Sequence, residues 1–459
     1  MGKVIKRAVW ILLLGMFCVL SGAKFRRYLM LKEAAAGMEA VFFPQTLGEK
    51  TEQKLDELVI RHEKEEAKLP AFYDYREEGR AVPVRNQGFY GTCWAFASLT
   101  ALETALMPEE ETDFSRDHLN FNNSYALSTE EGGSYIMALA YLAAWQGPVL
   151  EQDDPYGDNY SPEGLAAVKH VQSVRMPDHK DYEAIKQTVY LYSGVESSLY
   201  MDFDNPHQES DYYSREHASY CYNGDAVPNH DIVIIGWDDG YPAEKFKNPP
   251  EGDGAFICQN SWGEDFGDSG IFYVSYYDTN IGTYNLAYTR VDDTDNYDTV
   301  YQSDLCGWSG QIGYNSNTGY FANVYETQGT QELQAVGFYA TGGDTEYRLA
   351  VVPDFQDADS LKGLAYLQGG YLQYSGFYTI ELDEPVTVRP GQKFAVAVWI
   401  TTPEVLYPIA AEFAAADLKS EVDLEDGEGY ISPNGKDWER VEEGQESNLC
   451  LKVYAKEQP

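Results

Sequence analysis

The segment Gln87–Ser98, with the sequence QGFYGTCWAFAS, decides the fold and the chemistry that we expect of this chain. Cys93 follows a glycine turn and precedes an apolar run that is typical of a buried helix. A thiol must ionise before it attacks a carbonyl, and the free N–H groups and positive dipole end of a helix N-terminus favour the thiolate. Cys93 is therefore the candidate nucleophile. We expect the Gln87 amide and the Cys93 backbone N–H to bind the oxyanion of a tetrahedral intermediate.

A base, and a group that orients it, occur further along the chain. His230 lies at the entrance of the β-branched run 232–235, which is typical of a buried strand. Asn260 ends a second apolar run, 255–259, and Trp262 lies just beyond. The Asn carbonyl can hold an imidazole in orientation, and an indole can shield that hydrogen bond from water. Four residues are the candidate catalytic set: Cys93, His230, Asn260 and Gln87.

Each of these residues has a structural reading when it is taken alone. A single cysteine is more often a small buried apolar residue, a single histidine a hydrogen-bonded structural one, and Asn-Ser-Trp-Gly a turn. The four residues together, in this order and with the glycines around them, favour catalysis.

The order Gln, Cys, His, Asn resembles that of the papain-like cysteine peptidases. The further segments that carry this resemblance are 69–76, 82–87, 114–119, 131–133, 260–263 and 267–272. The resemblance covers about residues 69–280 and implies an α+β peptidase domain over 69–290, with a helical left lobe and a β-barrel-like right lobe. It implies peptide hydrolysis through an acyl-enzyme on Cys93, with His230 as acid and base. It also implies that Gly132 and Gly133 lie along the cleft wall, where an extended substrate backbone can approach, and Trp262 is the third candidate substrate-binding residue.

The cleft loops depart from the pattern of the family. Tyr90 stands where many members have a second cysteine, and no cysteine accompanies the segment 131–133. The usual disulfide is therefore absent. We expect side-chain packing to stiffen these loops instead, with Phe89 and Tyr90 as the candidates.

From Asn296 onward, short strand-like runs alternate with glycine, asparagine and aspartate turns. The runs are 299–302, 319–325, 333–339, 347–352, 371–382, 394–400 and 449–454. They predict an antiparallel β-sandwich over 296–457. The segments 297–302, 306–308, 322–325 and 333–339 resemble the lectin-like domain that follows a papain-type domain in some exported bacterial peptidases. Cell-surface carbohydrate is therefore a candidate partner, although aromatic residues in a sandwich also serve as core.

The N-terminal residues indicate export. Lys3, Lys6 and Arg7 precede the apolar run 8–20, and small residues follow at 21–23. We expect a secretory signal over 1–23, with an uncleaved membrane anchor as the alternative. The resulting location is secreted or on the cell surface, and the resemblance to exported bacterial peptidases implies a bacterial source. The charged segment 24–68 is expected to include a helix, and both an inhibitory pro-segment and a solvated spacer fit it.

The composition of the chain limits its possible fold class and its possible partners. The chain has 459 residues, of which 44% are hydrophobic and 14% aromatic, which favours folded domains. A formal charge of -41 excludes nucleic acid as a partner, because a phosphate backbone would be repelled. The expected partner is a protein or peptide substrate, and neither a metal nor a cofactor is expected.

Two features are left open by the sequence. Cys306 with Cys450, and Cys221 with Cys258, are the favoured disulfide pairs among the alternatives. Four aspartates near the domain joint either form a solvated acidic linker or hold calcium: Asp292, Asp293, Asp295 and Asp298.

Two rival functions remain beside a peptidase. The papain-like domain could be a catalytically idle scaffold for surface binding, although all four catalytic positions carry competent residues. The same thiol chemistry could also serve a transpeptidase or amidase that acts on cell-wall material.

Overall fold

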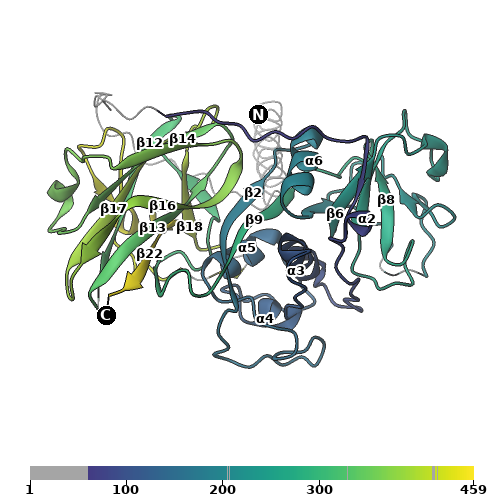
Figure 1. The fold of residues 1–459 in the computed structure, drawn as a ribbon, viewed down its shortest axis with the longest axis horizontal. Helices are drawn as coiled ribbons and strands as arrows, with labels where there is room; N and C mark the ends of the chain where they lie inside the picture. Colours follow the sequence, from purple (N-terminus) through teal and green to yellow (C-terminus); the bar gives the residue numbers. More distant parts are fainter. Residues whose placement is uncertain are drawn as a thin grey trace, which may run out of the picture.

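The computed structural model describes residues 60–458, except 204, 206, 328, 416–418 and 421. The expected signal segment 1–23 and most of the segment 24–68 lie outside the described residues. The described chain forms an N-terminal domain, from β1 (Phe72–Asp74) to β9 (Asn285–Asp293), and a C-terminal domain, from β10 (Thr299–Tyr301) to β22 (Leu451–Glu457). The two domains lie side by side in Figure 1.

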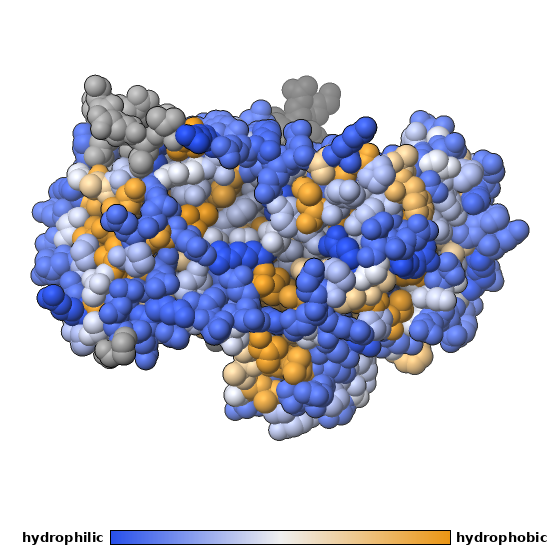
Figure 2. Space-filling view, in the orientation of Figure 1, coloured by the Kyte–Doolittle hydropathy of each residue, from blue (hydrophilic) through white to orange (hydrophobic). Residues whose placement is uncertain are grey.

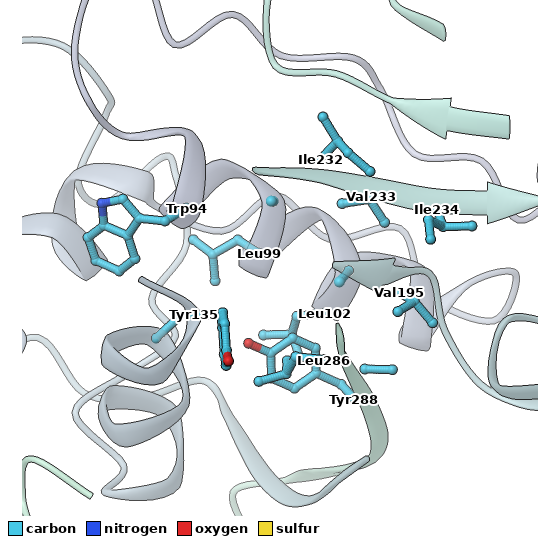
Figure 3. Packing of buried hydrophobic residues seen from close by; sticks show 14 of the residues in the cluster. Trp94, Leu99, Leu102, Tyr135, Val195, Ile232, Val233, Ile234, Leu286 and Tyr288 are labelled. Atoms are coloured by element: carbon cyan, nitrogen blue, oxygen red, sulfur yellow. The ribbon is translucent and has the colours of Figure 1, made fainter. Parts of the chain in front are cut away.

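The centre of the N-terminal domain is α3 (Cys93–Leu106). Its residues from Trp94 to Thr104 are all buried, as expected for a helix that is apolar on most faces. Figure 3 shows Leu99 and Leu102 pointing toward Tyr135 and Tyr288, which belong to α5 (Tyr135–Ala143) and β9. Packing on all sides makes α3 a rigid mount for its first residue.

Short helices and a sheet complete this domain. The helices are α2 (Tyr75–Glu78), α4 (Arg116–Phe121), α6 (Tyr182–Leu191) and the 3₁₀ turn η1 (Ala243–Lys245). The remaining strands are β2 (Lys169–Met176), β3 (Val195–Leu199), β4 (Tyr213–Ser214), β5 (Ser219–Tyr220), β6 (His230–Asp238), β7 (Ala255–Gln259) and β8 (Ile271–Ser275). The buried strands predicted over 232–235 and 255–259 are confirmed as β6 and β7.

The C-terminal domain is an all-β sandwich, as predicted. A six-stranded sheet has the order β15-β14-β17-β12-β19-β20, and a three-stranded sheet has the order β11-β18-β21. A third sheet, which contains β22, supplies much of the opposite layer. The buried core between the layers includes Phe321, Leu349 and Val398 of the six-stranded sheet and Val336 and Val453 of the third sheet. The strand bounds are β11 (Gly310–Ile312), β12 (Thr318–Glu326), β13 (Gln331–Ala340), β14 (Thr345–Val352), β15 (Gln368–Leu372), β16 (Ser375–Val388), β17 (Lys393–Thr401), β18 (Ile409–Phe413), β19 (Gly429–Ser432), β20 (Glu439–Arg440) and β21 (Ser447–Leu449). The short helices η2 (Ala358–Leu361) and α7 (Val441–Gln445) lie among these strands in the sequence.

Two of the predicted strands in this domain are wrong in their extent. The run 371–382 is divided between β15 and β16, because the chain leaves the six-stranded sheet after Leu372 and joins another sheet at Ser375. The run 449–454 is likewise interrupted at Cys450, between β21 and β22.

The two domains share one sheet of thirteen strands. Strand β16 of the C-terminal domain pairs with β2, with Phe377 opposite Val174, and β2 pairs in turn with β9. Figure 1 shows β2 and β9 between the two bodies. The joint is therefore a hydrogen-bonded ladder as well as the acidic segment seen in the sequence.

The acidic residues near the joint contact other groups of the chain itself, and two of them pair with cations. Asp292 pairs with Arg290 at 2.7 Å, and Asp293 pairs with Lys169 at 2.6 Å. The Asp298 carboxylate accepts a hydrogen bond from the Glu457 backbone N–H at 2.8 Å.

The segment before the N-terminal domain is extended, so the helix expected in this region is wrong over residues 60–66. His62 stacks on Tyr371 of β15, with ring centroids 4.5 Å apart. The Ala67 backbone exchanges two hydrogen bonds, of 2.8 and 2.7 Å, with the Gln187 side chain on α6. Side chains of both domains thus replace the hydrogen bonds that a helix would make within itself, and the segment crosses from one domain to the other (Figure 1).

Neither favoured disulfide is formed, since Cys221, Cys258, Cys306 and Cys450 are all free thiols. Cys221 packs with Tyr241 and Phe246, whereas Cys258 belongs to the main core of the domain. The Cys306 thiol donates to the Ser124 carbonyl at 3.5 Å. These cysteines are therefore small buried residues of the core rather than cross-links.

The visible face of the molecule is mostly hydrophilic (Figure 2). Within the described ranges, no helix has both the length and the apolar character needed to cross a bilayer.

Candidate active site

Cys93 is the first residue of α3, directly after the N-cap residue Thr92. It is half-buried, whereas the other four described cysteines are fully buried. The sharp approach to the helix is set by Gly91, where a Cβ would lie 3.0 Å from the Thr129 carbonyl oxygen and 3.1 Å from the Gly132 nitrogen. The glycine before the cysteine is therefore required by the close contact of two loops.

His230 begins β6, and its ring is held from two directions. Its Nε2 donates to the Asn260 side-chain carbonyl at 2.7 Å, and Asn260 follows directly after β7. The Trp262 indole lies against the imidazole with ring centroids 4.7 Å apart. A proton on Nε2 leaves Nδ1 as the acceptor, so the asparagine selects the tautomer that can act as a base.

Gln87 is buried and is fixed by both ends of its amide. Its Oε1 accepts from the Ser261 hydroxyl at 2.6 Å, and its Nε2 donates to the Tyr90 carbonyl at 2.9 Å. An amide nitrogen carries two hydrogens, so one of them stays available for a substrate oxygen. Gln87 is thereby tied to the residue that follows Asn260.

Tyr156 is a residue of the site that the sequence analysis missed. Its hydroxyl lies 2.7 Å from the Thr92 hydroxyl and donates to the Gln87 carbonyl oxygen at 2.9 Å. Its ring also packs edge-on against Phe96, at 4.8 Å. Tyr156 thus holds the Gln87 loop against the start of α3. No local pattern in the sequence marks a lone tyrosine for this role.

Cys93 and His230 line one pocket of about 460 Å³. Gly132 and Gly133 line the same pocket. Gly132 has φ +79°, which disfavours any residue with a side chain. A Cβ at Gly133 would lie only 2.3 Å from the Trp94 indole. The two glycines are therefore required by the loop conformation and by its packing on α3, besides any contact with substrate.

Burial determines the protonation states of the two reacting groups. Burial first, and then the negative charge of Asp231, raise the pKa of the Cys93 thiol to about 12, while the backbone N–H groups of Asp231 and Trp94 act in the opposite direction. Burial also lowers the pKa of His230 to about 4, against the effect of its hydrogen bond to Asn260. Forming either charge alone is thus costly, whereas transfer of the proton from sulfur to imidazole creates two charges that stabilise each other.

The cleft wall is held by the C-terminal domain rather than by a disulfide. Lys419 pairs with Glu131, at 2.6 Å from both carboxylate oxygens. The Tyr125 hydroxyl donates to the Cys306 carbonyl, and the backbones of Tyr125 and Ser420 form an isolated antiparallel β-bridge. By contrast, Phe89 is 98% exposed, so the expectation that Phe89 and Tyr90 pack together to stiffen this region is wrong for Phe89.

Two family models match the chain in succession. Residues 69–291 match the papain family of cysteine proteases, and residues 300–455 match the lectin-like domain. Among curated proteins, cathepsin J of Rattus norvegicus is 27% identical over 260 residues, which is 52% of this chain and 72% of that protein. The viral cathepsin of Heliothis zea nuclear polyhedrosis virus is 30% identical over 214 residues, which is 45% of this chain and 53% of that protein.

Solved structures match over both domains. The clostridial cysteine protease Cwp84 after propeptide cleavage has a TM-score of 0.74 at 26% identity, over 84% of this chain and 99% of that structure. A structure of the cysteine protease and lectin-like domains of Cwp84, a surface layer associated protein of Clostridium difficile, has a TM-score of 0.73 at 25% identity. This second match covers 85% of this chain and 90% of that structure.

Proposed function

Because residues 69–291 belong to the papain family of cysteine proteases and residues 300–455 form a lectin-like domain, we propose that this chain is an exported bacterial endopeptidase. It cleaves proteins at the cell surface through an acyl-enzyme on Cys93. The observation that carries the proposal is the 2.7 Å hydrogen bond from His230 Nε2 to Asn260, in a pocket that His230 shares with Cys93.

In the proposed reaction, Cys93 loses its proton to His230 Nδ1 as its sulfur attacks the scissile carbonyl. The carbonyl oxygen becomes an oxyanion, which accepts hydrogen bonds from the Gln87 amide and the Cys93 backbone N–H. His230 then returns the proton to the leaving amine, and the carbon–nitrogen bond breaks to give a thioester. His230 finally takes a proton from water, whose oxygen attacks the thioester. The carbon–sulfur bond breaks to release the acid product, and the proton passes from His230 to the Cys93 sulfur.

Several residues position these groups without joining the reaction. Asn260 holds the ring of His230, and Trp262 covers that hydrogen bond. Tyr156 and Ser261 fix the main chain and the side chain of Gln87. Each of these contacts fixes a side-chain or main-chain rotation of His230 or Gln87 before the substrate binds. The entropy cost of ordering these groups is therefore not added to the activation barrier.

The proposed location rests on two observations. The segment 1–23 has the form of a secretory signal, and Cwp84, which matches over both domains, is described as associated with a surface layer. The lectin-like domain is proposed to retain the enzyme at the cell surface through carbohydrate. Mass spectrometry of the culture medium should detect the protein with a mature N-terminus beyond residue 23, and its confinement to the cytoplasm would contradict export.

Peptide cleavage tests the catalytic proposal. The full chain should hydrolyse an unstructured protein such as casein, and Cys93→Ala should abolish this hydrolysis. Cys221→Ala is the matched control, because Cys221 is a buried thiol outside the cleft. A thiol-directed epoxide should add once, at Cys93, since the other described cysteines are buried. Unchanged cleavage by Cys93→Ala would exclude the mechanism, and cleavage of peptidoglycan fragments alone would assign the chemistry to the cell wall.

A further inference from the structure

The pocket beside Cys93 is acidic. Its lining includes the carboxyl residues Glu130, Glu131 and Asp231, and it includes no lysine or arginine among the described residues. Glu131 is already paired with Lys419, and Glu130 is exposed. Asp231 is half-buried, lines the pocket with Cys93 and His230, and acts through its charge on the Cys93 thiol, so it is the carboxyl group of the pocket that lies next to the catalytic pair.

The Asp231 side chain is held in a defined orientation. It lies directly across the β3–β6 ladder from Ser198, so both side chains are on the same face of the sheet. The buried Ser198 hydroxyl donates to Asp231 Oδ1 at 2.5 Å. Within the part of the chain that the structure describes, no basic side chain forms an ion pair with Asp231. Its charge is therefore not neutralised by the described residues.

A second carboxyl group, that of Glu196, lies near Asp231 but is buried away from the pocket. Glu196 is buried on the same face of β3, and the Ser98 hydroxyl donates to it at 2.5 Å. Burial raises the pKa of Glu196 well above its ordinary value, and the nearby charge of Asp231 acts in the same direction, so ionisation of Glu196 is disfavoured. Burial raises the pKa of Asp231 only to about 6, and its hydrogen bond from Ser198 opposes the shift. Of the two carboxyl groups, Asp231 is therefore the one that ionises more readily.

Two aromatic rings form the apolar part of the same pocket. Tyr135 and Tyr284 have ring centroids 6.4 Å apart and both line the pocket. An aliphatic stem can lie along such rings while its charged end reaches a carboxylate. Lysine and arginine side chains have this combination of a stem and a cationic end.

We propose that Asp231 and Ser198 form the floor of a specificity subsite, and that the enzyme prefers substrates that place a lysine or arginine side chain in it. This inference rests on the proposed peptidase function and adds the class of substrate to it. A neutral side chain of the same size leaves the Asp231 carboxylate desolvated without a partner, whereas a cation forms a charge-assisted hydrogen bond with it.

Arginine and citrulline peptides provide a sharp test, because citrulline has nearly the shape of arginine without its charge. A quenched fluorescent peptide is prepared with arginine, or with citrulline, at each position near the scissile bond in turn. At one position, kcat/KM should be at least about tenfold higher with arginine. Equal cleavage of the two peptides at every position would overturn the subsite and leave the peptidase intact. Failure of wild type to cleave either peptide, or protein substrates, would instead count against the peptidase function.

The variant Asp231→Asn identifies the residue responsible. Asparagine keeps an acceptor for the Ser198 hydroxyl, so the fold of the pocket is retained while the charge is lost. The preference for arginine should fall to about threefold or less, with citrulline peptides still cleaved. Glu130→Gln removes the exposed carboxylate of the same pocket and should keep most of the preference. An unchanged preference in Asp231→Asn would overturn the assignment, as would its complete loss in Glu130→Gln.

Discussion

Lys419 Nζ lies 2.6 Å from both carboxylate oxygens of Glu131, which joins a residue of the C-terminal domain to the wall of the catalytic cleft. The hydroxyl and backbone N–H of Ser128 bind the same carboxylate, each at 2.9 Å. Glu131 directly precedes the two cleft glycines. The position of that wall therefore depends on a contact between domains.

Charge reversal at this pair tests the coupling between the domains. Lys419→Glu places two carboxylates together and should lower kcat/KM by roughly fivefold at most, because exposed ion pairs are weak. The exchange of both charges, Lys419→Glu with Glu131→Lys, should restore part of the loss. Kinetics on one fluorogenic peptide give both values, and a double variant that is no better than Lys419→Glu would show that the pair does not couple the domains.

Removal of the Tyr156 hydroxyl should impair catalysis more than binding. In Tyr156→Phe the Gln87 carbonyl loses a hydrogen bond, and the oxyanion donor on the same residue becomes less well placed. We expect kcat to fall about tenfold with KM little changed, since the oxyanion forms only during the reaction. Tyr160→Phe is the control, because Tyr160 is 65% exposed. A fall confined to KM would contradict this role.

Gly133→Ala should destabilise the protein. The new Cβ would lie 2.3 Å from the Trp94 indole, so the loop or the ring must move. Overpacking of this kind costs about 1–3 kcal/mol, and the displaced cleft wall should also lower kcat/KM. Gly444→Ala, with no atom within 4 Å of its Cβ, is the matched control for urea unfolding. Equal stability of the two variants would disprove the close contact.

The buried ion pair of Arg116 and Glu103 should be important for stability. Arg116 Nη1 and Nη2 donate to the two Glu103 oxygens at 2.6 and 2.8 Å, and both residues are buried. Glu103→Leu leaves the guanidinium without its main partner and should cost about 3–5 kcal/mol in the free energy of unfolding. Asp113→Asn, which alters the exposed second partner of Arg116, should cost much less. Comparable losses in the two variants would contradict this account.

The proposed preference for arginine should depend on pH. Burial raises the pKa of Asp231 to about 6, so its carboxylate is charged above pH 6 and gains a proton below it. The groups facing it are Glu196, Ser198, Cys93, Tyr135 and Tyr284. The ratio of kcat/KM for arginine over citrulline peptides should therefore be highest above pH 7 and fall toward one near pH 5. The ratio removes the pH dependence of the catalytic residues themselves, and a constant ratio would contradict the prediction.

The elements around the site could be predicted because their signals are local. Trp94 to Leu106 is apolar on most faces, and the run after His230 is β-branched, so α3 and β6 follow from composition and order. The hydrogen bond between His230 and Asn260 could be anticipated only through the resemblance to a known family, since no periodicity relates the two positions.

Contacts between distant segments could not be predicted from one sequence. The run 371–382 has continuous strand character, and its division at Gln373 and Tyr374 is set by the change of sheet. The support of the cleft by Lys419 and Tyr125, and the role of Tyr156, likewise depend on tertiary packing. An even number of cysteines favours cross-links at the level of the sequence, whereas Cys221 and Cys258 are free thiols that belong to different hydrophobic clusters.

The ladder between β2 and β16 has a consequence for the evolution and engineering of such enzymes. If the sandwich were cut away, β2 would become the open edge of the peptidase sheet, with unpaired N–H and C=O groups that invite aggregation. A catalytic fragment ending at residue 291 would need a substitute strand or a redesigned border. The sandwich therefore differs from a domain on a flexible linker, which can be exchanged freely between enzymes. Any exchange has to keep β16 together with a matching β2 in the peptidase domain.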